Sequence, residues 1–344
     1  MSEADQVIDG GPAVTVTAKA QQLTTRVSTK PRTLMSDAWR RFRKHRLAMI
    51  GAAILVFFSL AVFIGPIFYV PYLVRQLETS GMPVPSQNPD LEVLIDHLDF
   101  LNILSPPTLT HPFGTDDLGR DLLARSLYGG RISLMVGFMA MVIAISIGAV
   151  VGALAGFFGK TIDQILMRIT DLFLSLPGVP LTILTVYLFR EPVIQAIGSP
   201  EAGIFLIVVA VVGGLAWMQT ARIVRASFLS LKEKEFVEAA TALGVGRRSI
   251  MFKHILPNAI GPIIVAATLE VGNAIIAEST LSFLGVGFPP DTPTWGRLVT
   301  DGSQYLQTSP WLALFPGALI FLTVLSINFL GDGLRDALDP RSRL

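Results

Sequence analysis

Six apolar segments, each about as long as a membrane-spanning helix, dominate the amino-acid sequence. A helix needs roughly 20 apolar residues to cross the hydrocarbon core of a bilayer. Only 15% of the 344 residues are charged and 51% are hydrophobic, whereas a soluble domain carries about 25% charged residues. We therefore predict an all-α, polytopic membrane bundle with six transmembrane helices. The predicted spans are residues 47–70, 132–158, 172–189, 202–221, 259–277 and 311–331.

The distribution of charge predicts the orientation of these spans. Cytoplasmic segments of membrane proteins carry an excess of Lys and Arg. A basic cluster lies directly before the first span, so we predict that both termini are cytoplasmic. Binding of anionic lipid or nucleic acid is an alternative use of this cluster, and we favour topology over both. The cluster comprises Arg40, Arg41, Arg43, Lys44 and Arg46.

Three arginines lie on the predicted outer side, contrary to the cytoplasmic excess of Lys and Arg. Three aspartates lie near them in the sequence, and we expect the two sets to pair. The arginines are Arg120, Arg125 and Arg131, and the aspartates are Asp116, Asp117 and Asp121.

The spans divide the chain into five predicted parts. Residues 1–34 are polar and lack the apolar core of a cleavable signal peptide, so we expect a disordered cytoplasmic tail. The other parts are an N-terminal segment with the first span (35–71), an extracytoplasmic loop with an insert (72–131), a five-helix core (132–331) and a cytoplasmic tail (332–344). In the insert we expect little regular structure beyond one short helix near residues 90–101.

A polar insertion, which we call the knob, interrupts the apolar segments at residues 232–258. Gly244 follows its first half, at a position where a left-handed helix cap suits glycine. Arg247 and Arg248 are expected to open a second short helix, and Pro257 to close it, because proline cannot continue the hydrogen-bond ladder. The first half has apolar residues at helical spacing, namely Phe236, Ala239, Ala240 and Leu243.

The knob resembles the coupling loop of ABC-importer permeases, whose pattern is Glu-Ala-Ala, three residues, Gly, and then Ile-x-Leu-Pro. One departure is His254, which stands where the pattern has Ile. The resemblance implies that the knob docks in a groove on an ATPase subunit and passes its motion to the spans. An ordinary solvated loop is the alternative. The matching residues are Glu238, Ala239, Ala240, Gly244, Leu256 and Pro257.

Two further stretches resemble the C-type permease subunit of dipeptide, oligopeptide and nickel ABC importers. They are HPFGTDDLGRDLLARSLYGGRISL at 111–134 and STLSFLGVGFPPDTPTWGRLVTDG at 279–302. The likeness covers residues 35 to the end, apart from the insert at 72–108. It implies the type I ABC importer permease fold and a bacterial or archaeal plasma-membrane location. The chain would form half of a translocation pathway, with peptide as the expected substrate among several that the family imports.

The same resemblance implies the partners. They are a second, homologous permease that completes a heterodimer, two cytoplasmic ABC ATPase subunits and an extracytoplasmic solute-binding protein. ATP and Mg²⁺ would be used by the ATPases, and this chain is expected to bind no cofactor, metal or nucleic acid.

No catalytic or nucleotide-binding motif stands out. The stretch from Gly156 to Thr161 ends in Gly-Lys-Thr but has Leu154 where a phosphate-binding loop needs glycine. The chain has no cysteine, and its four histidines lack metal-ligand spacing. We therefore predict a subunit that is not an enzyme.

Four residues are candidates for lining a pathway. Glu270 and Asn273 lie three positions apart, hence on one helical face, and an intramembrane carboxylate usually faces a cavity or a partner. The alternative, which we favour, is a structural role, either as an interhelical bond or through a position near the cytoplasmic interface. Pro177 and Pro180 break the third span, which would suit either a pathway wall or a simple kink. Glu278 is expected at the outer interface.

Glycines recur every four residues in the second span, at Gly148, Gly152 and Gly156. Small residues at this spacing let two helices approach closely in lipid. We predict a helix–helix contact, with a substrate-lining face as the alternative. A self-sufficient secondary transporter remains the alternative function, although it would need coupling-ion sites on broken helices in two repeated halves.

Overall fold

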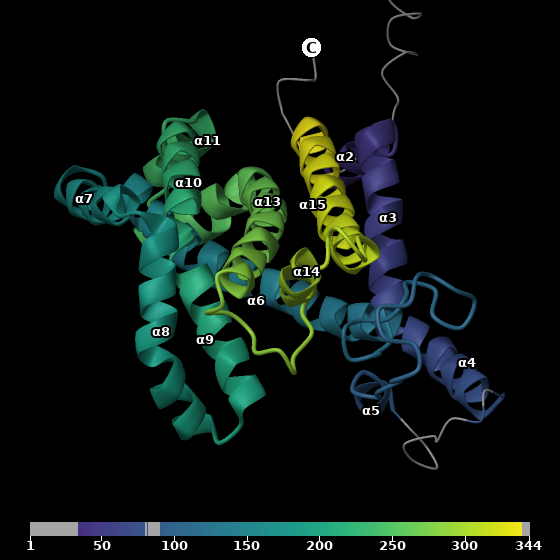
Figure 1. Cartoon of the computed structure of the whole chain (residues 1–344). Coiled ribbons are helices and arrows are strands. Elements are labelled where there is room, and N and C mark those ends of the chain that lie inside the picture. The colour runs from purple at the N-terminus through teal and green to yellow at the C-terminus, as the bar shows by residue number, and fades with distance from the viewer. Residues whose placement is uncertain (1–33, 80, 82–89, 339–344) are drawn as a thin grey trace, which may run out of the picture.

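The computed structural model describes residues 34–79, 81 and 90–338. The predicted disordered tail lies outside these residues except for its last position, and so does the end of the C-terminal tail. All regular elements within the described residues are helices (Figure 1). The predicted all-α class is confirmed.

Five helical segments are long and apolar enough to cross a membrane, and a bent pair provides a sixth. The break of the third span at Pro177 was predicted, whereas the break in the fourth predicted span, between α9 and α10, was not. The five are α3 (Arg46–Phe63), α6 (Leu122–Phe158), α9 (Pro200–Gly214) with α10 (Trp217–Lys232), Arg247–Phe283, and α15 (Trp311–Leu338). The sixth is α7 (Lys160–Ser175) with α8 (Gly178–Ile197), which meet at 87°.

Several helices extend beyond the predicted spans. The first span ends near Ile64, and α4 (Gly65–Thr79) continues into the region expected to be an irregular insert. The short helix expected near 90–101 is α5 (Leu91–Leu94). The side chain of Asp121 accepts a hydrogen bond from the Ala124 backbone N–H and so begins α6 ten residues before the predicted span.

The long helix α6 is the centre of the bundle. It packs against α10 and against α13 (Leu256–Phe283), and α13 in turn packs against α15. Gly148, Gly152 and Gly156 are buried in the crossing with α10, which confirms the predicted helix–helix contact. Figure 1 shows α3 and α15 side by side, with the hairpin of α8 and α9 on the other side of the bundle.

A buried polar network organises the segment before α6. Asp116 accepts hydrogen bonds from Arg120 Nε at 2.7 Å and from Arg125 Nη1 at 3.2 Å, so this part of the predicted pairing is confirmed. Arg125 also donates to the Pro290 carbonyl and ties this segment to the loop before α14 (Trp295–Ser303). Arg131 instead donates to the Val62 carbonyl on α3.

Asp121 is part of the same network and is not paired with an arginine. It accepts from Tyr69 Oη at 2.9 Å and lies 2.8 Å from His111 Nδ1. Burial and the adjacent carboxylate raise the pKa of the Tyr69 hydroxyl, which therefore stays protonated and donates. These hydrogen bonds join α4 and the segment around His111 to the start of α6.

Candidate functional site

The knob is built from two helical pieces joined by a tight turn. The first is α11 (Glu235–Ala242), and Gly244 follows it with φ +76°, the left-handed conformation expected there. The second piece begins at Arg247 as α12 (Arg247–Ser249) and becomes a π-helix, η1 (Ile250–Ile255). This π-helix runs directly into the membrane-spanning α13.

The prediction that Pro257 closes the second helix is wrong. Pro257 lies in the first turn of α13, and the helical path continues through it from Arg247 to Phe283. Proline lacks a backbone N–H, but a helix tolerates it in a first turn, where that donor has no intrahelical partner. The wider π turn just before it provides such a junction. The second half of the knob and the span are therefore one continuous helical rod.

An apolar core fixes the base of the knob to three spans. Val237 and Ala240 of α11 are buried together with residues of the π-helix, α6, α10 and α13. The ammonium of Lys232 donates to the Phe157 carbonyl at 2.7 Å and lies over the Phe157 ring. The base of the knob is thus packed against the ends of all three spans. The other members of this core are Phe157, Val224, Phe228, Ile250, Met251, Ile255 and Ala259.

The rest of the predicted apolar stripe points away from the protein. Of its four members only Ala240 is buried, while Phe236, Ala239 and Leu243 are exposed. The Leu243 side chain is 84% exposed, although it is a large apolar residue. Glu238, Arg247, Arg248 and Pro257 are also exposed, and Leu256 is half-buried. The knob therefore presents an apolar patch, Phe236, Ala239 and Leu243, within a charged surface.

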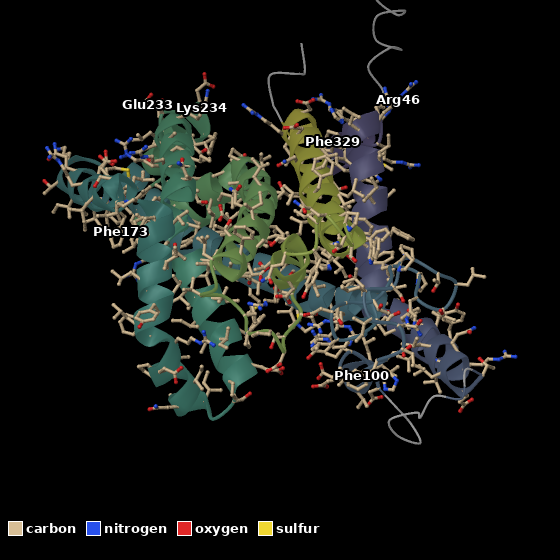
Figure 2. All side chains as sticks on the ribbon, viewed as in Figure 1. Arg46, Phe100, Phe173, Glu233, Lys234 and Phe329 are labelled. Atoms are coloured by element: carbon tan, nitrogen blue, oxygen red, sulfur yellow. The ribbon has the colours of Figure 1, made fainter. Side chains whose placement is uncertain are left out.

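The knob lies at the same end of the molecule as the basic cluster. Figure 2 shows Glu233 and Lys234 beside α11 at this end. Arg46, at the start of α3, lies at the same end. Phe100, in the insert, lies at the opposite end. The end that carries the knob thus also carries the positive charge that precedes the first span.

The candidate pathway residues do not come together in one site. Pro177 is exposed and caps α8, and Pro180 lies in the first turn of the same helix. Glu270 is buried on α13, and Asn273 is exposed one turn later, within hydrogen-bonding reach of the Glu270 carboxylate. Because α8 packs against α9 whereas α13 packs against α6 and α15, the two pairs belong to different faces of the bundle.

Glu278 is the centre of a buried hydrogen-bond network, which the sequence analysis did not predict. It was expected at the outer interface, but its carboxylate is fully buried. It accepts hydrogen bonds from Thr294 Oγ1 at 2.7 Å, Ser282 Oγ at 2.9 Å and Ser133 Oγ at 3.3 Å. The hydroxyl groups surrounding it come from α6, α13 and the loop before α14. The serine and threonine residues next to Glu278 in the sequence could have indicated such a network.

We expect Glu278→Leu to destabilise the protein strongly. A buried hydroxyl that loses its acceptor costs about 1–3 kcal/mol, and three hydroxyls would be affected. Thermal unfolding in detergent would measure the loss. Glu233→Leu makes the same change at an exposed position and should leave the unfolding temperature nearly unchanged. Equal unfolding temperatures for both variants would contradict the assigned role of Glu278.

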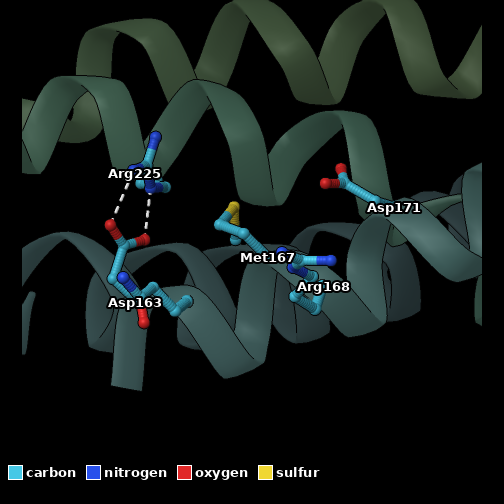
Figure 3. Close-up of a pocket in the computed structure, with 6 residues that line it drawn as sticks. Asp163, Met167, Arg168, Asp171 and Arg225 are labelled. Carbon is cyan, nitrogen blue, oxygen red and sulfur yellow. Dashed lines mark hydrogen bonds and ion pairs between the residues drawn. The ribbon is translucent and has the colours of Figure 1, made fainter. Parts of the chain in front are cut away.

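Two ion pairs join α7 to α10 beside the knob. The guanidinium of Arg225 makes a bidentate contact with Asp163, with Nη2 2.6 Å from Oδ2 (Figure 3). Arg222 pairs with Asp171 at 2.6 Å two turns further along α7. Between the helices is an open cavity of about 340 Å³, lined by Asp163, Gln164, Met167, Arg168, Asp171 and Arg225. In residues 34–79 and 90–338, no three acidic or histidine side chains are placed to hold a metal ion.

Two family models match the chain. Residues 148–344 match the model described as "Binding-protein-dependent transport system inner membrane component". Residues 33–89 match the model described as "N-terminal TM domain of oligopeptide transport permease C".

Curated relatives match over most of their length. An oligopeptide transport system permease protein of Haemophilus influenzae is 41% identical over 91% of this chain and 90% of its own. A dipeptide transport system permease protein of Alkalihalophilus pseudofirmus is 38% identical over 89% of this chain and 90% of its own. The chain also aligns with a chain of the inward-facing MetNI methionine ABC transporter at 21% identity and a TM-score of 0.49, covering 63% of this chain and 96% of that one.

Proposed function

Because this chain belongs to the family of binding-protein-dependent transport inner-membrane components, we propose that it couples ATP hydrolysis in partner subunits to peptide import. It forms half of a translocation pathway, and a related permease forms the other half. The family is one of transport permeases, and this chain contributes a pathway rather than a catalytic centre. ATP and Mg²⁺ are used by two ATPase subunits on the knob side of the membrane.

The observation that carries this proposal is the geometry of the knob. Its apolar patch of Phe236, Ala239 and Leu243 is exposed on the described part of the chain, while its opposite face is fixed to three spans. Exposed apolar patches with polar rims mark docking surfaces for other proteins. An ATPase subunit whose groove binds this patch would be connected through the knob to the three spans.

Transmission then follows from the contacts at the base of the knob. ATP-driven closure of the ATPases moves the knob, and the shared core moves the ends of α6, α10 and α13 with it. The ion pairs of Arg225 and Arg222 carry the same displacement to α7 and so to α8. The pathway alternates between inward-facing and outward-facing states, and hydrolysis resets it.

The face that would line the pathway lies on α13. Its exposed side chains recur at helical spacing as Leu269, Asn273, Ile276 and Phe283, so Asn273 is the polar group within an apolar stripe. Glu270 lies directly behind it and orients the amide. A peptide bond pairs well with an amide side chain, because each offers both an N–H donor and a carbonyl acceptor. Peptide is also the substrate in the names of the relatives.

The orientation of the termini is part of the proposal. The basic cluster and the knob occupy one end, and excess positive charge favours the cytoplasmic side. Both termini and the ATPases therefore lie in the cytoplasm, and the insert faces an extracytoplasmic solute-binding protein.

Purification from native membranes, followed by transport assays, tests the proposal. We expect tagged protein to recover a second permease and ATPase subunits, identified by mass spectrometry. The complex in vesicles should take up peptide only with ATP and the binding protein. Isolation of the chain alone, with uptake driven by an ion gradient and without ATP, would overturn the proposal in favour of a secondary transporter.

A further inference from the structure

The helix α7, together with the residue that follows it, carries an apolar stripe that the described chain leaves about half exposed. Five side chains at helical spacing, i, i+3, i+7, i+10 and i+14, are between 41 and 61% exposed. A regular stripe of this kind indicates an amphipathic helix with its apolar face turned toward an apolar medium or partner. The stripe comprises Ile162, Ile165, Ile169, Leu172 and Leu176.

The opposite face of α7 prevents the stripe from turning inward. Asp163 and Asp171, eight residues apart, are held by Arg225 and Arg222 of α10. Between these ion pairs Thr170 is buried, and Phe173 and Leu174 pack against the cluster around Trp217. Rotation of α7 about its own axis would break both ion pairs and this packing. The stripe is therefore held in its outward orientation.

The two ends of α7 fix its position relative to a membrane. It begins after Phe158, where the span α6 ends, and it stops at Ser175, two residues before α8. The turn into α7 is sharp, since Gly159 and Lys160 both have positive φ, at +63° and +47°. At its other end α7 meets α8 at 87°. The 20 residues of α8 are long enough to cross a bilayer without α7, so the bent pair fits a helix along the membrane surface followed by a span.

We propose that α7 is an interfacial helix, with its stripe buried among the acyl chains of the leaflet on the knob side. Its charged face lies at headgroup depth, where Arg225 and Arg222 hold the two aspartates. Arg168 is exposed beside the stripe and Lys160 is exposed at the start of α7, and both match the phosphate groups of lipids. The surface joins the lipid-facing surface of α6, where Val150 and Phe158 are exposed. Lipid thus sets the depth of α7 in the membrane, and α7 connects α10 to α8.

The absence of cysteine from the sequence allows a direct test. Single cysteines replace Ile165 or Ile169 in the stripe, and Gln164→Cys provides a matched control on the polar face. Each variant is labelled with a nitroxide, and the transporter is reconstituted in nanodiscs of phosphatidylethanolamine and phosphatidylglycerol. Collision of the nitroxide with molecular oxygen reports lipid exposure, and collision with a water-soluble nickel chelate reports water exposure.

We expect the ratio of oxygen to nickel collisions to be several-fold higher at Ile165→Cys and Ile169→Cys than at Gln164→Cys. Equal ratios at the three sites would place the stripe in water and overturn the proposal. Low access to both reagents, with cross-linking of the cysteine to another subunit, would mean that a protein covers the stripe and would overturn it as well. Leu172→Cys provides the same comparison if either stripe variant fails to assemble. The test needs neither substrate nor ATP, so its outcome is independent of the proposed function.

Discussion

Leu243→Glu is expected to abolish ATP-driven uptake while the protein accumulates normally in the membrane. The Leu243 side chain is 84% exposed and makes no core contact, so the fold does not depend on it. In a docked complex the same side chain is the centre of the apolar patch. Central apolar contacts of an interface are worth about 2 kcal/mol or more, which corresponds to about 30-fold in affinity. A buried, unpaired carboxylate adds a further cost.

Uptake of labelled peptide, normalised to protein abundance, measures this effect, and co-purification of the ATPase subunits measures docking. Leu243→Met is the matched control, because methionine retains the apolar volume and should preserve both. If Leu243→Glu transports as well as Leu243→Met at equal abundance, the exposed patch is not the docking surface.

Gly152→Leu should prevent the bundle from assembling. A Cβ atom at Gly152 would lie 2.8 Å from Val224 Cβ and closer still to the Ala221 carbonyl oxygen. Both neighbours belong to α10, and one is backbone, so neither can move aside without separating the two spans. Overpacking of a close contact costs about 1–3 kcal/mol for small additions, and leucine adds four carbons. We expect the amount of folded protein extracted in mild detergent to fall to a small fraction of the wild-type value.

Gly214→Leu is the matched control for this effect. A Cβ at Gly214 meets no atom within 4 Å, and leucine favours helix more than glycine does. This variant should therefore be recovered at close to the wild-type level. Equal recovery of the two variants after size-exclusion chromatography would contradict the close packing of α6 on α10.

The spans and the knob could be predicted because both depend on local sequence. Long apolar segments need a membrane whatever their neighbours are, and Gly244 adopts the left-handed turn because of its own lack of a side chain. The glycine contact of α6 was also local, since a four-residue spacing defines one helical face. Family likeness then supplied the role of the knob, which spacing alone does not contain.

The features that the sequence did not predict depend on contacts between distant segments. The periodicity of Phe236 and Leu243 indicated an apolar face, but Val237 became the inward residue because Phe228 and Met251 lie on that side. Likewise, Glu278 is buried because Ser133 and Thr294, far away in sequence, supply its hydrogen bonds. Pro177 marked a break correctly, yet the 87° turn depends on how α10 holds α7.

The π-helix η1 has a consequence for the length of the chain between the knob and the pathway. Because no loop interrupts the helical path after Arg247, the second half of the knob and Asn273 share one winding axis from Arg247 to Phe283. An α-helix advances about 100° per residue, so each inserted or deleted residue in this stretch turns one end against the other. A flexible connector would limit only the distance between the two ends. A continuous helix also fixes the rotation of one end relative to the other. In the proposed transporter, the six residues of η1 thus set the direction in which α13 faces when the knob is seated.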